Sequence, residues 1–239
     1  MNLPKSYAEA KRVLSEVGMG YETIDVCKYD CSLFWGDHAI ITHCPECGHS
    51  RWRYQDRKRK VPHKILWYFP IIPRFQRFFS SREMSEHTRW HKDRRVVEKN
   101  VMRHPADGKA WEHFDEVHKP FAPDPRNLRL GFAKDGFNPF GHMSSTYSTW
   151  PVFLIPYNFP PWMCMDQSNF MMALLILGKY SPGKDFHVFM QPLIHDLKKL
   201  WDGVPTKDVL ENKEFNLHAA VLWTIHDYPA YGTTSGRST

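Results

Sequence analysis

The stretch NLRLGFAKDGFNPFG, residues 127–141, places apolar residues in alternation up to one acid, Asp135, and then breaks into a turn. The stretch AAVLWTIHDYPAYG, residues 219–232, repeats this design with an apolar run, Asp227, and then proline and glycine. Alternating or dense apolar runs that end at turn residues indicate strands. Each stretch therefore predicts a strand that ends at a carboxylate, and the arrangement of the two strands decides the fold.

The segments between these two stretches predict the other elements of this half of the chain. Residues 149–156 and 168–177 are apolar runs that indicate two further strands. Residues 184–201 carry apolar side chains at three- and four-residue steps, which is typical of an amphipathic helix. Pro192 predicts a kink in this helix or a later start. The predicted order is strand, strand, strand, helix, strand.

This order predicts where the two acids lie. An antiparallel meander of three strands, followed by a helical crossover, returns the fourth strand parallel to the first and beside it, so Asp135 and Asp227 would lie at one sheet edge. Adjacent carboxylates repel unless divalent cations lie between them. Two such ions, magnesium or manganese, would support in-line displacement at phosphorus, which is nuclease or strand-transfer chemistry. The other interpretation is that each aspartate only caps a turn.

Four of the five cysteines have the spacing of a metal site. Cys27, Cys31, Cys44 and Cys47 form a C-x3-C-x12-C-x2-C pattern, in which two close pairs can converge tetrahedrally on zinc. Gly48 follows the second pair, where a tight metal-binding turn favours glycine. A closed four-thiolate site is structural, so we expect zinc to stabilise the fold and to leave no position for a substrate.

The excess positive charge lies in one segment. The chain has a formal net charge of +6, while residues 51–103 contain 16 Lys and Arg against 5 Asp and Glu, a net charge of +11. Aromatic residues are interleaved with these cations, which suits phosphate contacts and base stacking; the alternative is a solvated linker. The residues that we predict to bind DNA are Arg51, Arg53, Arg57, Lys58, Arg59, Lys60, Arg74 and Arg77. The run Arg57–Lys60 could equally be a nuclear-import signal.

Composition indicates a folded protein with no membrane-spanning segment. Of the 239 residues, 42% are hydrophobic and 24% are charged, as in globular proteins. The longest apolar run, residues 170–177, is about half of what a membrane-spanning helix needs, and the N-terminus lacks the pattern of a secretory signal. We expect a helix and four-cysteine module over 1–60, a basic aromatic-rich linking region over 61–125, and a catalytic region over 126–239.

Many motifs along the chain resemble one protein family. They are LPKSYAEAK, YETIDVC, HCPECGHSRW, FPIIPRFQRFF, RHPADGKAW, DPRNLRLGFAKDGFNPFG, YSTWPVFLIPYNFPPWMCM, SPGKDFHVFMQPLIHDLKKLW and LWTIHDYPAYG. Over almost its whole length the sequence resembles the large transposase of plant CACTA-type (En/Spm) DNA transposons. The resemblance implies an α/β fold with an RNase H-like core, transposon-end DNA as partner, action in the nucleus, self-association, and no small-molecule substrate. Asp135 and Asp227 match the first two catalytic acids of the family.

The family carries a third catalytic acid on a later helix, beyond the YG at Tyr231 and Gly232. The chain ends at Thr239, so we expect an incomplete transposase with a partial RNase H-like core that is poorly active or inactive alone. One alternative is a non-catalytic, zinc-dependent DNA- or protein-binding remnant of a transposon. Another is a fragment that does not fold stably, which a broad, non-cooperative melt would indicate.

Overall fold

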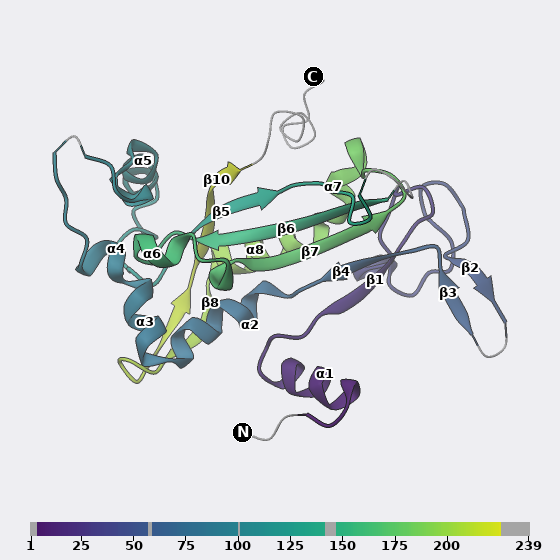
Figure 1. Cartoon of the computed structure of the whole chain (residues 1–239), viewed down its shortest axis with the longest axis horizontal. Helices are drawn as coiled ribbons and strands as arrows, with labels where there is room; N and C mark the ends of the chain where they lie inside the picture. Colours follow the sequence, from purple (N-terminus) through teal and green to yellow (C-terminus); the bar gives the residue numbers. More distant parts are fainter. Residues whose placement is uncertain (1–3, 57–58, 100, 142–146, 226–239) are drawn as a thin grey trace.

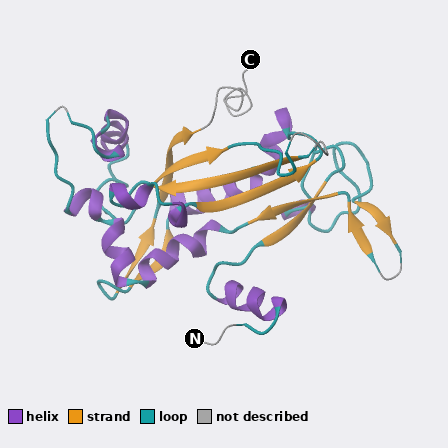
Figure 2. Cartoon of the chain, viewed as in Figure 1, coloured by secondary structure: helices purple, strands orange, loops and turns teal. Residues whose placement is uncertain are grey.

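A computed structural model describes residues 4–56, 59–99, 101–141 and 147–225. A six-stranded mixed sheet crosses the molecule, with helices along one face and at one end (Figure 1, Figure 2). Its strand order is β1-β4-β7-β6-β5-β10. The bounds of these strands are β1 Glu22–Val26, β4 Lys64–Tyr68, β7 Met171–Gly178, β6 Ser148–Pro156, β5 Leu128–Lys134 and β10 Ala219–Ile225.

The four strands predicted from the second half of the chain are confirmed, and so is their arrangement. β5, β6 and β7 form an antiparallel meander. β10 returns parallel to β5 and beside it, with Ala219 opposite Leu128 and Ile225 opposite Ala133. The carboxyl ends of β5 and β10 therefore lie at the same edge of the sheet.

The crossover between β7 and β10 differs from the single predicted helix over 184–201. Two helices, α7 (Phe186–Phe189) and α8 (Gln191–Asp202), replace it, and Pro192 lies in the first turn of α8. Proline is tolerated there because the first helical N–H groups have no partner within the helix. A hairpin of β8 (Val204–Asp208) and β9 (Lys213–Leu217) follows, in a segment where the sequence did not indicate strands.

The N-terminal half adds two strands to the same sheet. α1 (Tyr7–Glu16) begins after Ser6, whose hydroxyl accepts a hydrogen bond from the Glu9 N–H. β1 and β4 then pair antiparallel, and β4 pairs with β7. Residues from the predicted zinc module and from the predicted linking region thus extend the sheet of the predicted catalytic region.

The remaining elements complete one hydrophobic core that is shared by the sheet and its helices. The short α-helices are α2 Ile71–Gln76, α3 Arg82–Thr88, α4 Trp90–Asp93, α5 Lys109–Val117 and α6 Pro161–Cys164. The 3-10 turns are η1 Gly36–His38, η2 Arg77–Ser80, η3 Pro105–Asp107, η4 Gln167–Asn169 and η5 Gly183–Asp185. Cys164, the fifth cysteine, is buried. Within the described ranges, no helix is long and apolar enough to cross a membrane.

Candidate functional site

Asp135 lies directly after β5, at the edge where β10 also ends. Its side chain is exposed, and Oδ1 accepts a hydrogen bond of 2.7 Å from the Gly136 N–H. Asp227 lies outside the described residues, two positions after the last residue of β10. The structure therefore places one of the two predicted acids, and it places the strand that leads to the other.

The turn after Asp135 is held against β6. A Cβ atom at Gly136 would lie 2.4 Å from the indole ring of Trp150, so only glycine fits beneath this ring. Trp150 donates a 2.6 Å hydrogen bond to Ser148 Oγ. The backbones of Phe137 and Thr149 form an isolated bridge across the same turn. Packing of this turn against β6 thus fixes the backbone next to Asp135.

Replacing Gly136 with alanine is expected to lower the free energy of unfolding by about 1–3 kcal/mol, because the added methyl group overpacks the contact with Trp150. Urea denaturation measures this loss. Gly178→Ala is the matched control, since its Cβ would meet no atom closer than 3.4 Å. Equal stability of the two variants would contradict the account of this turn.

The four predicted zinc ligands come together. Their sulfur atoms all lie within 4.8 Å of one another, and neighbouring sulfurs are 3.4 Å (Cys27–Cys31), 3.5 Å (Cys27–Cys47) and 3.8 Å (Cys31–Cys44) apart. Zinc–sulfur bonds of about 2.3 Å in a tetrahedron require sulfurs about 3.8 Å apart. The donor set and its spacing therefore fit a structural zinc ion.

Two tight turns position the cysteines. Cys27 follows β1, and Asp30 in the first turn has φ of 64°. In the second turn Gly48, with φ of 69°, donates its N–H to the Cys44 carbonyl, which fulfils the expectation of a glycine there. His38 and His43 lie close to the cysteines in sequence, but both are exposed and lie outside the cluster.

The thiols differ in their tendency to ionise. Burial raises the pKa of Cys27 and of Cys31. Burial also acts on Cys44, but hydrogen bonds from Ser32 and from the backbone at Cys47 outweigh it and lower the pKa of Cys44 to about 6. A thiolate is the form of cysteine that binds metal. The lowered pKa of Cys44 therefore favours its metal-binding form near neutral pH.

The predicted DNA-binding residues fall into two groups, of which the first is engaged within the fold. Arg51 is an internal link: its Nε donates to Asp25 at 2.6 Å, and its Nη1 donates to the Ala39 carbonyl at 2.7 Å. Arg74 is buried and donates to the carbonyls of Met19 and Gly20, and burial lowers the pKa of its guanidinium. Both arginines therefore have partners within the fold, and DNA contact by either of them stays a prediction.

The second group holds the cations that reach the surface. Arg53, Arg59 and Lys60 are exposed on the hairpin of β2 (Trp52–Gln55) and β3 (Lys60–Pro62). Arg77 is partly engaged, because its Nη1 donates to the Val17 carbonyl at 3.3 Å. Arg57 and Lys58 lie outside the described residues. The hairpin is therefore one part of the basic segment that offers cations to a partner; Arg82 and Lys99 are also exposed.

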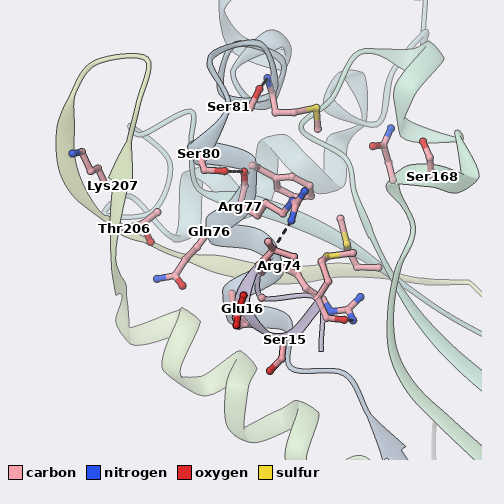
Figure 3. Close-up of a pocket in the computed structure, with 18 of the residues that line it drawn as sticks. Ser15, Glu16, Arg74, Gln76, Arg77, Ser80, Ser81, Ser168, Thr206 and Lys207 are labelled. Carbon is pink, nitrogen blue, oxygen red and sulfur yellow. Dashed lines mark hydrogen bonds between the residues drawn. The ribbon is translucent and has the colours of Figure 1, made fainter. Parts of the chain in front are cut away.

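A cleft that the sequence did not indicate lies between α1, the α2–α3 region and β8 (Figure 3). Its volume is about 1060 Å³, and the charged residues in its lining are Glu16, Arg74, Arg77 and Lys207. Figure 3 shows Arg77 within the cleft and Lys207 at its far side. The cleft is positive, but with one carboxylate in its lining it does not resemble a two-metal centre.

Comparison with known families decides the class of protein. The profile described as "Transposase family tnp2" matches residues 99–239, more than half of the chain. The chain belongs to the tnp2 transposase family. The matched region of this tnp2 transposase contains β5 to β10, Asp135 and Asp227, whereas the four cysteines precede it. No curated protein and no solved structure shows significant similarity to the chain.

Proposed function

We propose that this tnp2 transposase acts on transposon-end DNA as a plant CACTA-type (En/Spm) enzyme, through an RNase H-like core. Membership of the transposase family supports a DNA substrate. The observation that carries the catalytic proposal is the sheet: β10 runs parallel beside β5, and Asp135 follows β5 directly. The order β7-β6-β5-β10, with three antiparallel strands and one parallel strand, is the order that the resemblance to an RNase H-like core implies.

The register of the two strands supports a pairing of the two acids. Ala133 lies opposite Ile225. Asp135 and Asp227 each follow two residues later in the sequence, so the same offset leads from the paired positions to both acids. The two strands end at the same edge of the sheet, and each acid follows its paired residue by two positions. Both facts favour a joint role of Asp135 and Asp227 over two unrelated turn caps.

The chemistry assigned to this edge is phosphodiester cleavage and strand transfer. Bound magnesium or manganese ions would activate the attacking oxygen and stabilise the leaving oxygen. Asp135 and Asp227 would hold these ions through their carboxylates, and the Gly136 N–H orients the carboxylate of Asp135. A third acidic ligand belongs to this scheme by resemblance to the family. We therefore expect residues 1–239 alone to cleave DNA weakly or not at all.

The experiment that tests this proposal is a nicking assay with purified protein, Mn²⁺ and DNA that carries the transposon terminal repeat. Any metal-dependent nicking is expected to be low, and it should vanish in Asp135→Asn and in Asp227→Asn, because each change removes an anionic ligand. Asp37→Asn, at an exposed carboxylate in η1, is the control. Strong nicking that requires Asp135 would contradict only the expected low activity and would leave the assignment of the acids intact. Nicking that survives both substitutions would contradict the assignment of the acids.

A second candidate function is non-catalytic, zinc-dependent binding of DNA or protein, by a remnant of a transposon. The observation that favours it is the four-cysteine site, which fits zinc and lies before the region matched by the transposase family. It predicts salt-dependent DNA binding that survives the loss of Asp135 and Asp227. Both candidate functions imply action in the nucleus, and both are compatible with self-association.

A further inference from the structure

The β2–β3 hairpin is separate from the main sheet. Its two strands form a two-stranded sheet of their own, with Gln55 opposite Lys60 and Tyr54 opposite Val61. In Figure 1 the hairpin projects beyond the end of the six-stranded sheet, at the end opposite α3 to α5. An isolated two-stranded hairpin is marginally stable in water, so it needs an anchor.

The zinc module provides this anchor through Arg51, the residue before β2. The guanidinium of Arg51 lies 5.0 Å from the centre of the Phe34 ring and 4.7 Å from the Trp52 ring, and it is paired with Asp25 on β1. The Arg51 N–H donates to the Thr42 carbonyl. The segment between Thr42 and Arg51 contains Cys44 and Cys47. The contacts of Arg51 therefore connect the four-cysteine site, β1 and the start of β2.

The hairpin presents cations that no carboxylate neutralises. Arg53, Arg59 and Lys60 are exposed, and among the described residues none of the three is paired with a carboxylate. The acid of the hairpin, Asp56, is used within the turn: it accepts hydrogen bonds from the Arg59 N–H at 2.6 Å and from the Tyr54 hydroxyl at 2.8 Å. Tyr54 is 55% exposed beside these cations.

The foot of the hairpin lies in a positive field. Burial lowers the pKa of His63, and the charges of His49, Lys28 and Arg53 lower it further. Lys28 belongs to the turn between Cys27 and Cys31, so cations from the metal-binding turn and from β2 act on the same ring.

We propose that the β2–β3 hairpin enters the major groove of duplex DNA and that Arg53, Arg59 and Lys60 contact its phosphates. The proposal rests on the proposed function, which makes DNA the substrate. The major groove is about 12 Å wide and admits a two-stranded β-ribbon. Cations bind phosphates with the release of counterions. The four-cysteine site would fix the orientation of the β2–β3 hairpin relative to the six-stranded sheet.

Geometry favours duplex DNA over single-stranded DNA. A ribbon that docks in a groove requires two strands of nucleic acid, whereas aromatic stacking on single strands requires several exposed rings along a groove. In the described part of the hairpin, Tyr54 is the highly exposed aromatic residue. Duplex DNA should therefore bind more tightly than a single strand of the same sequence.

The test is duplex binding by the full chain, measured by fluorescence anisotropy at several salt concentrations. The triple variant Arg53→Ala, Arg59→Ala, Lys60→Ala should bind about 10- to 100-fold more weakly at low salt. The slope of log K against log salt should fall in magnitude by about 2–3, which is about 0.9 for each phosphate that the variant no longer neutralises. The control with an equal change of charge replaces three exposed lysines elsewhere, Lys109, Lys119 and Lys213, with alanine.

The outcomes separate this proposal from the proposed function. A triple hairpin variant that binds like the control variant would overturn the docking of the hairpin, even if Asp135-dependent cleavage persists. Equal affinity of the wild-type chain for single strands would overturn groove docking. Loss of binding in the triple variant, together with wild-type-level nicking in Asp135→Asn and Asp227→Asn, would leave the hairpin supported and the catalytic assignment refuted. A wild-type chain that binds no DNA would refute both.

Discussion

A chain in which Cys44 and Cys47 are both replaced with serine is expected to lose its bound zinc and the order of residues around the metal site. Zinc binding to such sites is worth about 10 kcal/mol or more, and it stabilises only the folded form. Zinc content, measured by mass spectrometry of the purified protein, should fall from about one ion per chain to almost none. Hydrogen exchange should accelerate at β1 and at the β2–β3 hairpin, since Arg51 connects both to the metal-binding turns.

Cys164→Ser is the control for this experiment. Cys164 is buried, like Cys44, but it lies outside the cluster and donates to the Phe159 carbonyl at 2.9 Å, a contact that a serine hydroxyl can replace. This variant should keep its zinc and its exchange protection. Stoichiometric zinc in the variant without Cys44 and Cys47 would refute the assignment of the ligands.

The second large effect is expected at Asp208, a buried carboxylate at the end of β8. It is paired with Arg89 and lies 3.4 Å from Arg126, and it accepts a 2.7 Å hydrogen bond from Ser85 Oγ. Asp208→Ala removes a negative charge from beside the two largely buried guanidinium groups of Arg89 and Arg126. Breaking a buried pair in this way costs about 3–5 kcal/mol, and we expect about 3 kcal/mol because Glu211 also pairs with both arginines.

Chemical denaturation measures this loss, with Asp202→Ala as the control, because Asp202 is exposed at the end of α8. A loss of less than about 1 kcal/mol in Asp208→Ala would contradict the role of the network, since a buried pair is worth more than this. The network joins α3 to the β8–β9 hairpin, so proteolysis in the region of residues 204–217 should become faster in the same variant.

The same carboxylate predicts the effect of pH. Burial raises the pKa of Asp208, but hydrogen bonds from Ser85 and the Leu210 N–H, with the charge of Arg89, outweigh it, so the pKa is lowered. A group with a lowered folded pKa adds stability above its unfolded value, about 3.9, and this stability is lost as pH falls through the folded pKa. Stability should therefore decline below about pH 4, and less steeply in Asp208→Asn.

The sequence predicted strands β5, β6, β7 and β10 well because the signals for them are local. Residues 128–134 and 219–225 are apolar runs that end at turn residues, and a parallel return beside the first strand follows from the connection between them. The four cysteines were equally local, because two close pairs are visible without knowledge of the fold.

Other features depend on partners that are distant in sequence. β1, with the sequence ETIDV, is a half-polar strand whose place at the sheet edge is set by β4, about 40 residues later. The β8–β9 hairpin has few apolar residues, and its turn has a positive φ at Asn212 that no glycine marks.

The basic residues show the same limitation. Arg51 and Arg59 are both arginines of the basic segment. Arg51 is paired with Asp25, which lies 26 positions earlier in the sequence, whereas Arg59 is exposed. Composition therefore predicts the charge of the segment but not which cations reach a partner. The positive cleft around Arg77 and Lys207 was missed for the same reason, because it combines segments about 130 residues apart.

A metal site between Asp135 and Asp227 is tested most directly by adding Mn²⁺ to the isotope-labelled chain and recording which amide signals it broadens. Broadening should centre on the carboxyl ends of β5 and β10, at residues 133–136 and 224–225, and Asp135→Asn should remove it. Broadening confined to other acidic surfaces, or unchanged by Asp135→Asn, would contradict a metal site between Asp135 and Asp227.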